Sequence, residues 1–583
     1  MKKINYILCS FLLAAGLAGC GKDESVPVGG KAKTPELTEL SGTEINGTTL
    51  GNGVNLAGVI TDQSTGKGIA GVAVTDGYQF VKTDANGVYQ MTRNQLARKV
   101  YYTLPADYQV VLDNLYHLPM FYSPGIMDKS KSYRCDFTLK KLSAPETNFT
   151  MVMIGDPQCQ TIDDVARFMG ETIPDIKNTL GSTDELSPNV YAIGLGDVTF
   201  DSYYTFSPMA QAMKNVVING RYLPIFNSAG NHDHNSLVTA SGNQETDDYN
   251  SLEMYVKYFG PTDYSFDRGN VHIVVMDNVY VTKIASSSSP NAKTWNYENK
   301  LTDTQMEWLR QDIANVENPG SKLILFVTHQ PVRSEDATGN YAEVMKMLST
   351  FNEAHILTGH THYVQNYIHE NGGKEVYEHV HGAACGAWWA SNINVTGAPN
   401  GYNIYSIKNN KVEGWVLKPT GKEFGYQMRV YNGNQQFGSE NAPASTKYSV
   451  NWYTNSTIKV SSTSIALKGC SSFKNSFVAE VFDDDAKYWT LEFWQNGQKV
   501  GDFTRAADKG ICNMPVCAYW FNDMGKSSDT WSSTTASHYW YFTPESKDPE
   551  SEQNWEVRAA HNFPNGGSKT YTCSKLTTDY SEF

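Results

Sequence analysis

This 583-residue sequence lacks closely spaced cysteine pairs, an excess of basic residues and, at its N-terminus, an apolar run long enough to cross a membrane. Its nine cysteines include no pair with CxxC spacing, so a zinc site built from thiolates is disfavoured. Basic residues are fewer than acidic ones, 47 against 61, which disfavours nucleic-acid binding by broad electrostatic attraction. The N-terminal apolar run at residues 7–18 is too short to span a bilayer.

Residues 1–19 have the pattern of a secretion signal, with Lys2 and Lys3 before the apolar run and small residues after it. The segment LAGC at residues 17–20 resembles a bacterial lipobox, which implies cleavage before Cys20 and lipid attached to it. The GKDE segment that follows resembles the acidic export tag of surface lipoproteins in the Bacteroides group, with an ordinary solvated linker as the alternative. We therefore expect an outer-membrane lipoprotein, facing the cell surface or the periplasm, that meets the membrane through the anchor at Cys20.

Removal of Lys2 and Lys3 from the 47 basic residues leaves 45 against 61 acidic ones, a net charge of −16 for the mature chain. The length favours about three or four domains. Residues 20–53 lack apolar periodicity and are predicted to be a linker. Residues 54–144 alternate short apolar segments with turns such as DANG and predict an N-terminal β-sandwich. On GKGIAGVAV and TDANGVY, this domain resembles the carboxypeptidase-regulatory-like domains of secreted proteins.

Residues 145–407 have a different pattern, because strand-length apolar runs alternate with segments of helical period. The runs are NFTMVMIGD, VYAIGLGD, YLPIFNSAGN, VHIVVMDN, LILFVTH and AHILTGH. The expected helices span residues 163–180, 207–217, 250–259, 303–316 and 341–350. In the fourth, Thr302 and Gln305 make a capping box. This alternation predicts an α/β domain with largely buried sheets.

Residues 408–583 return to short strands and Gly or Asn turns, which predict a C-terminal β domain. The region is rich in tryptophan. Alternating aromatic residues in strands are more often core than a sugar-binding platform, so we expect core. Four of the cysteines lie here, and an oxidising envelope would permit disulfides whose pairing the sequence does not define.

Each central apolar run ends in side chains that bind metals or phosphate. In chain order the runs deliver Asp156, Asp197, Asn231 with His232, Asp277, His329, and His360 with His362. In α/β sheets the carboxyl ends of strands open onto the crevice where ligands bind, so we expect these side chains to gather at one edge. The distribution of histidines supports this expectation, since seven of the thirteen histidines lie between His329 and His381.

Carboxylates, imidazoles and an amide together suit borderline ions such as Mn, Fe or Zn. Two such ions, divalent or trivalent and about 3.5 to 4 Å apart, can share a carboxylate and a hydroxide and clamp a phosphoryl group. The hydroxide serves as nucleophile, so no serine or cysteine is needed. Metal charge also offsets the repulsion between an acidic protein and a phosphate ester.

Five motifs in order now identify a resemblance: GDPQ, GDVTFD, GNHD, THQP and GHTH resemble the blocks of the calcineurin-like metallophosphoesterases, over about 260 residues. With the flanking β domains and the segment GAACGAWWASNINVTGAPNGYNIYSI, the chain is similar to Bacteroides-type lipoproteins of that superfamily. The resemblance implies an α-β-β-α sandwich with a dinuclear site. The first metal would be held by Asp156 and His362, Asp197 would bridge, and the second would be completed by Asn231, His329 and His360. His232 would protonate the leaving oxygen.

This chain departs from the family pattern at two positions. Gln158 stands where most relatives have histidine; its carbonyl can ligate, though more weakly than imidazole, so we include it among the metal ligands. Phe200 stands where many relatives have aspartate or tyrosine, and the next residue, Asp201, is a candidate to orient His232.

Three further residues are candidate substrate contacts, namely His234, Trp388 and Trp389. For His234 the alternative is a solvent-facing loop residue, and for the tryptophans it is core packing. Asp277 is expected to make a buried hydrogen bond at a strand end.

The sequence therefore predicts a metallophosphoesterase that hydrolyses phosphomonoesters or phosphodiesters by attack of a metal-bridging hydroxide. The alternative is a catalytically weak or inactive surface lipoprotein that binds a glycan or another envelope ligand. The motifs do not choose a substrate.

Overall fold

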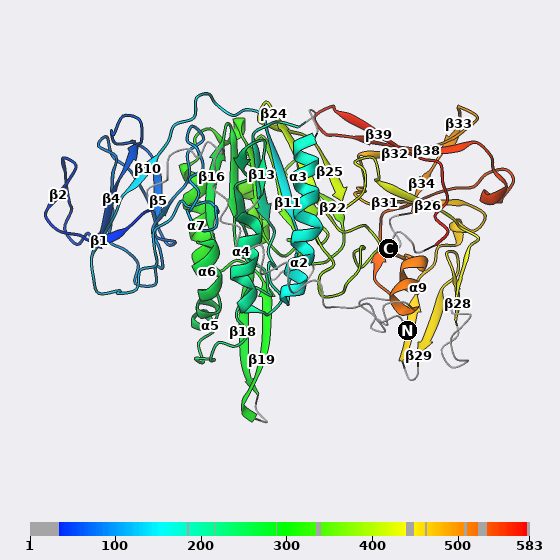
Figure 1. The fold of residues 1–583 in the computed structure, drawn as a ribbon, viewed down its shortest axis with the longest axis horizontal. Coiled ribbons are helices and arrows are strands. Elements are labelled where there is room, and N and C mark those ends of the chain that lie inside the picture. Colours follow the sequence, from blue (N-terminus) through cyan, green and yellow to red (C-terminus); the bar gives the residue numbers. More distant parts are fainter. Residues whose placement is uncertain are drawn as a thin grey trace, which may run out of the picture.

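The computed structural model describes residues 34–583, apart from residues 183–185, 215, 287–288, 334–339, 439–447, 461–462, 507–509, 523–532 and 580–582. The predictions on the signal segment, the lipobox and Cys20 lie outside the described residues. Figure 1 shows three regions: N-terminal strands in blue, a central region of strands and helices in cyan and green, and C-terminal strands from yellow to red.

Short strands joined by tight turns make up the N-terminal region. One sheet has the order β1-β9-β4-β10, with β7 also paired to β4, and another has the order β6-β5-β8. The predicted DANG turn is present, because Asp84 accepts the N–H groups of Asn86 and Val88, and Gly87 has a φ of 76°. The strands, including the hairpin β2–β3, are β1 (Leu37–Glu39), β2 (Glu44–Ile45), β3 (Thr48–Thr49), β4 (Leu56–Asp62), β5 (Ala73–Thr75), β6 (Phe80–Lys82), β7 (Val88–Met91), β8 (Tyr101–Tyr102), β9 (Tyr133–Cys135) and β10 (Phe137–Leu139).

Five strands form the first central sheet, in the order β15-β12-β11-β24-β25. Parallel pairing of β11 with β12 and of β12 with β15 places their carboxyl ends at one edge. The antiparallel hairpin β24–β25 carries the sheet to Pro419, past the predicted domain border at residue 407. The bounds are β11 (Phe149–Ile154), β12 (Val190–Gly194), β15 (Ile225–Asn227), β24 (Gly401–Lys408) and β25 (Lys411–Pro419).

Six strands form the second central sheet, in the order β16-β17-β20-β21-β23-β22. Strands β17, β20, β21 and β23 run parallel, while β16 and β22 pair antiparallel at the two edges. The bounds are β16 (Tyr264–Arg268), β17 (Val271–Val275), β20 (Leu323–Val327), β21 (Glu353–Thr358), β22 (Gln365–Asn371) and β23 (Lys374–Val380). Two hairpins stand outside the sheets, β13 (Val217–Ile218) with β14 (Arg221–Tyr222), and the long β18 (Val279–Ser286) with β19 (Ser289–Asn299).

All five predicted helical segments of the central region are helical, the first as two helices. Thr302 and Gln305 form the predicted capping box of α7. Helix α5 was not predicted; it is polar and is capped by Asn243, whose side chain accepts the N–H of Thr246. The α-helices are α2 (Ile162–Gly170), α3 (Thr172–Ser182), α4 (Phe206–Lys214), α5 (Gln244–Ser251), α6 (Glu253–Phe259), α7 (Asp303–Asn315) and α8 (Tyr341–Leu348). Single 3₁₀ turns are η1 (Tyr203–Thr205), η2 (Pro319–Ser321), η4 (Ser471–Phe473) and η6 (Pro549–Ser551).

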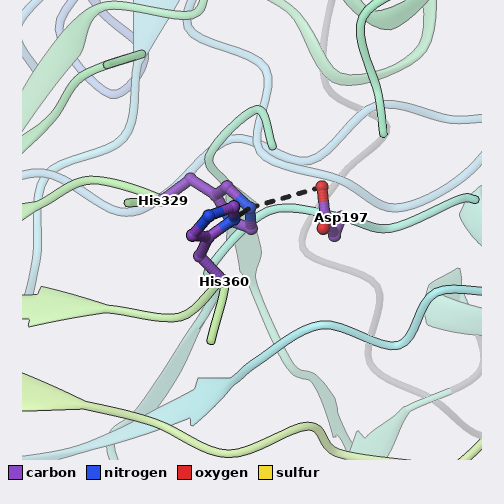
Figure 2. Close-up of side chains that lie close together, drawn as sticks. All are labelled: Asp197, His329 and His360. Carbon is purple, nitrogen blue, oxygen red and sulfur yellow. Dashed lines mark hydrogen bonds and ion pairs between the residues drawn. The ribbon is translucent and has the colours of Figure 1, made fainter. Parts of the chain in front are cut away.

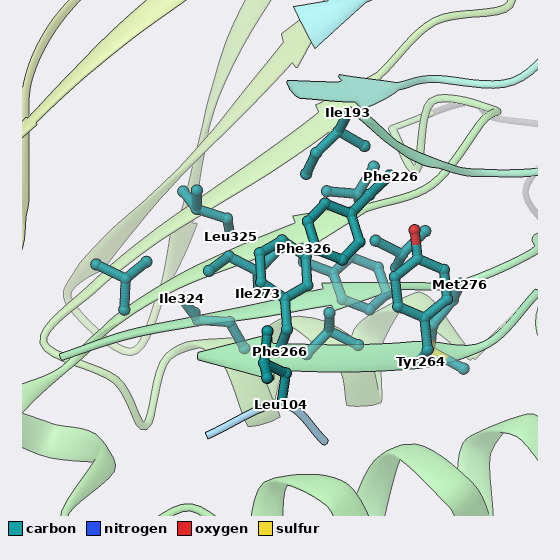
Figure 3. Close-up of a cluster of buried hydrophobic side chains, with 14 of the residues drawn as sticks. Leu104, Ile193, Phe226, Tyr264, Phe266, Ile273, Met276, Ile324, Leu325 and Phe326 are labelled. Carbon is teal, nitrogen blue, oxygen red and sulfur yellow. The ribbon is translucent and has the colours of Figure 1, made fainter. Parts of the chain in front are cut away.

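The two central sheets share one buried hydrophobic cluster. Met151 and Met153 of β11 belong to this cluster, whereas the alternate residues Val152 and Ile154 belong to a second cluster with α2, α3, α4 and α6. Figure 3 shows residues of both sheets in the shared cluster, and the ring of Phe226 in β15 stacks on that of a β16 residue, Phe266, with centroids 3.9 Å apart. Helices α7 and α8 add their buried side chains to the same shared cluster. The strand ends that carry the motifs are therefore held by a packed interior.

The C-terminal region contains two four-stranded sheets, β26-β31-β37-β34 and β33-β32-β38-β39, which contribute to one hydrophobic cluster. Trp452, Trp489, Trp520 and Trp540 are buried, in agreement with the predicted core role. The elements are β26 (Met428–Asn432), β27 (Gln436–Gly438), β28 (Ser449–Asn451), β29 (Ser456–Val460), β30 (Thr463–Leu467), β31 (Phe477–Val481), β32 (Trp489–Gln495), β33 (Gln498–Asp502), β34 (Thr504–Arg505), β35 (Ile511–Cys512), α9 (Met514–Asn522), β36 (Thr535–Ala536), β37 (Tyr539–Phe542), β38 (Trp555–Asn562) and β39 (Ser568–Cys573).

Six cysteines in the described part of the chain are free thiols in this structure, namely Cys135, Cys159, Cys385, Cys470, Cys512 and Cys517. Among the described helices, none combines the length and the apolar composition that crossing a bilayer requires.

Candidate metal centre

The ends of five strands bring the predicted ligands together. Asp156 and Gln158 follow β11, Asp197 follows β12, and the other ligands follow β15, β20 and β21. Two groups of three residues each offer ligand atoms within 4.8 Å of one another: Asp197, His329 and His360, and Asp156, Asp197 and His362. Because Asp197 belongs to both groups, it lies where a bridging ligand would lie. The predicted side chains do gather, but at the ends of strands from two sheets and not at the edge of one, because β11, β12 and β15 belong to the first central sheet and β20 and β21 to the second.

The backbone at these strand ends is strained. Five of the candidate ligand residues have a positive φ, which places their backbone in the left-handed region that residues other than glycine rarely adopt. The φ values are 41° at Asp156, 47° at Gln158, 50° at Asp197, 73° at His360 and 54° at His362. Such residues cost of order 1 to 3 kcal/mol each and cluster at functional sites. The strain marks these strand ends as a site and directs their side chains inward.

Glycines in the motifs permit the close approach of these loops. At Gly196, which has a φ of 94°, a Cβ would lie 2.5 Å from Nδ1 of His329. At Gly230 a Cβ would overlap the backbone nitrogen of Asp197. The loops after β12 and β15 therefore pack against each other with no room for a side chain at either glycine.

One half of the centre is built around the amide oxygen of Asn231. Its Oδ1 lies 3.0 Å from Nε2 of His329 and 2.8 Å from Nδ1 of His360. His329 Nε2 also lies 3.3 Å from Oδ1 of Asp197, and Figure 2 shows the two imidazole rings together on one side of that carboxylate. His329 donates its Nδ1 hydrogen to the carbonyl of Leu195 over 2.7 Å, which leaves Nε2 as the ligand atom.

The other half of the centre joins Asp156 to His362. Both oxygens of Asp156 accept the backbone N–H of His360 at 3.0 Å, and Oδ1 lies 3.8 Å from Nε2 of His362. That Nε2 is buried and has no hydrogen-bond partner among the described residues. A buried nitrogen without a protein partner is costly unless an ion or a water occupies the space in front of it. The donor set, carboxylates with imidazoles and an amide, fits transition-metal ions.

The protonation equilibria of the cluster are strongly perturbed. Burial, reinforced by the charge of Asp197, raises the pKa of Asp156 to about 8. Burial opposes ionisation of Asp197 as well, but the nearby histidines outweigh it and hold its pKa well below the usual range. Burial lowers the pKa of His360 to about 3 and that of His362 to about 4, so both imidazoles are neutral, as metal ligands must be.

Gln158 is placed differently from a metal ligand. Its Nε2 donates to Oδ2 of Asp197 over 2.8 Å, and its Oε1 accepts the indole N–H of Trp388 over 2.7 Å. A reversed amide would set oxygen against the carboxylate and nitrogen against the indole donor. In this arrangement the carbonyl oxygen is directed to Trp388, and metal ligation by Gln158 stays a prediction.

His232 lies beside the cluster as predicted for an acid. Its backbone N–H donates to Oδ1 of Asp197 over 2.8 Å, and its side chain is 23% exposed. Nδ1 lies 3.2 Å from Oδ1 of Asp201, the residue predicted to orient it. The ring stacks on Phe200 with centroids 4.1 Å apart. Burial works against protonation, but Asp197 and Asp201 outweigh it and raise the pKa of His232.

Two predicted substrate contacts are not placed to touch a substrate. His234 is fully buried, with Nδ1 2.7 Å from Oγ of Ser251 and Nε2 3.2 Å from Oδ2 of Asp277. It therefore faces the interior, and Asp277 makes the buried contact expected of it. Trp389 is 1% exposed, and its ring stacks behind His362 with centroids 5.2 Å apart. Trp388, by contrast, is partly exposed beside Gln158.

Two residues near the centre were not identified from the sequence. The buried carboxylate of Asp233 accepts the N–H groups of Val198, Thr199 and Gly230 at 3.0 to 3.2 Å, which ties the loop after β15 to the loop after β12. Tyr297, in the hairpin strand β19, places its ring edge-on to His360 with centroids 6.1 Å apart. Asp233 could have been identified from the sequence because it is the aspartate of the GNHD motif, whereas no motif marks Tyr297.

Three family models match the sequence. A model of the calcineurin-like phosphoesterase matches residues 149–364, a model of the N terminal of calcineurin-like phosphoesterase matches residues 54–142, and a model of its C terminal matches residues 378–566. No curated protein matches the chain.

Solved structures give more distant likenesses. The purple acid phosphatase PPD1 from yellow lupin seeds is 10% identical, over 59% of this chain and 69% of that one, with a TM-score of 0.30. Zinc-complexed Vps29 from Entamoeba histolytica is 14% identical, over 46% and 99%, with a TM-score of 0.19. A serine/threonine phosphatase from Saccharomyces cerevisiae is 11% identical, over 48% and 81%, with a TM-score of 0.22. These TM-scores are too low to support an argument.

Proposed function

Because the chain belongs to the calcineurin-like phosphoesterase superfamily, we propose that it is a metal-dependent hydrolase of phosphate monoesters or diesters. The observation that carries the proposal is the pair of ligand groups that share Asp197. The hydrophobic clusters on the two faces of the first sheet support an α-β-β-α layer order for the central domain, which carries the ligand groups.

The residues at the strand ends fit two transition-metal ions, Mn, Fe or Zn. Asp156, His362 and Asp197 would hold one ion, and Asp197 with Asn231, His329 and His360 would hold the other. When bound, such ions neutralise phosphoryl charge and lower the pKa of a water from about 15.7 to about 7, which supplies the nucleophile.

Hydrolysis forms a bond from water oxygen to phosphorus and breaks the bond to the ester oxygen. The ester oxygen leaves with the electron pair and takes up a proton, which His232 supplies. Asp201 engages Nδ1 of His232, so Nε2 is the nitrogen available to the leaving oxygen. Contact of the His232 backbone with Asp197 fixes this acid relative to the metal ligands.

The experiment that tests the function combines metal analysis with turnover. The purified protein, supplied with Mn²⁺, Zn²⁺ or Fe, is assayed with an aryl phosphomonoester and an aryl phosphodiester. We expect turnover of at least one ester, and its loss together with bound metal in Asp197→Ala, Asn231→Ala and His329→Ala. Asp163→Ala, on the exposed side of α2, is the matched control. Less than about one metal per chain and no turnover would instead favour the alternative, a surface protein that binds a glycan.

We also propose that the chain is an envelope lipoprotein anchored through Cys20. The support is the basic end, the apolar run and the LAGC segment at residues 1–20. Expression of the full chain with a labelled fatty acid tests it. Label and membrane association should both be lost in Cys20→Ala; retention of both would contradict the anchor.

A further inference from the structure

We propose that Phe200 and Trp388 form an aromatic shelf for the leaving group, and that the preferred substrates are phosphate esters of uncharged aromatic alcohols. This inference rests on the proposed function, because it concerns the alcohol side of the same hydrolytic site. The shelf consists of these two side chains, both of them partly exposed.

The position of the shelf follows from the acid. The ring of His232 stacks on that of Phe200 with centroids 4.1 Å apart, and the ring centroids of Phe200 and Trp388 are 5.0 Å apart. A general acid must come within about 2.6 to 3.2 Å of the oxygen that it protonates. The first atoms of the alcohol therefore lie against His232, and the surface that adjoins His232 is aromatic.

The shelf is fixed in place relative to the metal ligands. Trp388 donates its indole N–H to Gln158, whose amide donates in turn to Asp197. The loop that carries Trp388 is held by α2, because the guanidinium of Arg167 donates to the carbonyls of Gly386 and Ser391. A preorganised ring costs little conformational entropy when a ligand stacks on it.

The charge beside the shelf selects among aromatic alcohols. The side chain of Asp201 is 43% exposed next to His232. Its carboxylate would repel an alcohol that carries further negative charge, such as a nucleotide with more phosphates. A neutral ring gains a stacking contribution of about 0.5 to 1.5 kcal/mol beyond burial of its area, which corresponds to about 2- to 13-fold in affinity.

The test compares two esters whose alcohols have similar acidity but only one of which has a ring, phenyl phosphate and hexafluoroisopropyl phosphate, or their methyl diesters. The metal-loaded enzyme is assayed as wild type, Phe200→Leu, Trp388→Leu and Trp388→Phe. Trp494→Leu, which removes a partly exposed tryptophan of the C-terminal region, is the matched control.

We expect the wild type to favour the phenyl ester in kcat/KM, and Phe200→Leu and Trp388→Leu each to lower that preference about 2- to 13-fold, mainly through KM. Trp388→Phe keeps a ring and should retain most of the preference, and metal content should be unchanged in Phe200→Leu. The shelf is overturned if both esters are hydrolysed and Phe200→Leu leaves their ratio unchanged. A wild type that hydrolyses neither ester overturns the proposed function itself, which is a distinguishable result.

Discussion

Gln158 donates a hydrogen bond from its side-chain amide to Oδ2 of Asp197 over 2.8 Å. Its carbonyl oxygen accepts the indole N–H of Trp388, so in this arrangement the amide contributes a donor to the carboxylate and directs its oxygen away from it. The two halves of the centre are therefore unequal. One half offers Asp156, Asp197 and His362 as candidate ligands, and the other offers Asp197, Asn231, His329 and His360.

Because the two halves have unequal sets of candidate ligands, we expect the half with Asp156 and His362 to retain its metal less well than the other half. The Gln158→His substitution should reduce this difference. Imidazole binds borderline cations more strongly than an amide, so the variant should keep about two metals per chain after dialysis against a weak chelator, where the wild type keeps about one. Elemental analysis measures both. Gln160→His, an exposed glutamine two residues away, is the control and should change nothing. A wild type that already retains two equivalents would contradict the prediction.

The proposed role of His232 as an acid predicts that its loss affects esters with different leaving groups to different extents. His232→Asn removes the proton donor, and such groups contribute typically 10²- to 10⁴-fold. The loss in kcat should be large for an alkyl ester, whose oxygen needs the proton, and much smaller for a p-nitrophenyl ester. Steady-state kinetics on both esters give the comparison, with metal content measured alongside. Equal losses on the two esters would assign His232 a role other than protonation.

Asp233 is expected to matter for stability and for metal retention although it is not a ligand. Asp233→Asn replaces one acceptor oxygen by a donor that faces backbone N–H groups, and each donor left unsatisfied costs about 1 to 3 kcal/mol. We therefore expect a lower urea midpoint and weaker retention of metal. Asp163→Asn, an exposed aspartate on α2, is the matched control. Stability equal to that of the control would exclude the anchoring role.

The sequence predicted the strand ends because each buried run finishes in a short motif, and motif and burial are both local properties. The helices of the central region were predictable for the same reason, as the capping box of α7 illustrates. Helix α5 was not predicted because its residues are polar and give no apolar period; the side chain of Asn243 caps its first turn. The extension of the core sheet past residue 407 was not predicted, because β25 joins that sheet by antiparallel pairing, which has no sequence signal.

Side-chain direction was the least predictable property of the site. His234 stands two residues after His232, yet it turns inward to Asp277, a partner 43 positions away. Tyr297 reaches His360 only because the register of the hairpin β18–β19 puts it there. Contacts of this kind are set by tertiary packing, so a single sequence without its fold does not contain them in readable form.

The core of the central region contains a histidine paired with two carboxylates. His272 in β17 is 2% exposed and lies between two carboxylates, with Nδ1 2.7 Å from Asp267 and Nε2 2.8 Å from Asp312. Asp312 also accepts the hydroxyl of Ser265, and the ring of Phe351 stacks on the imidazole. Burial alone would lower the pKa of His272, but the two carboxylates outweigh it and raise the pKa from 6.5 to about 10.

As the pH rises, the unfolded state therefore releases the proton of His272 at a lower pH than the folded state does. The stabilisation from this proton is fully present below the unfolded pKa of 6.5 and is lost as the pH rises through about 10. His272→Gln should lower the free energy of unfolding by about 3 to 5 kcal/mol in mildly acidic buffer, because it removes the cation that pairs with the buried carboxylate of Asp312 and with Asp267. Urea unfolding followed by tryptophan fluorescence should show the gap to wild type narrowing toward about pH 10, and Asp312→Asn should weaken the same dependence. Parallel curves for wild type and His272→Gln across that range would show that the imidazole does not carry the proton.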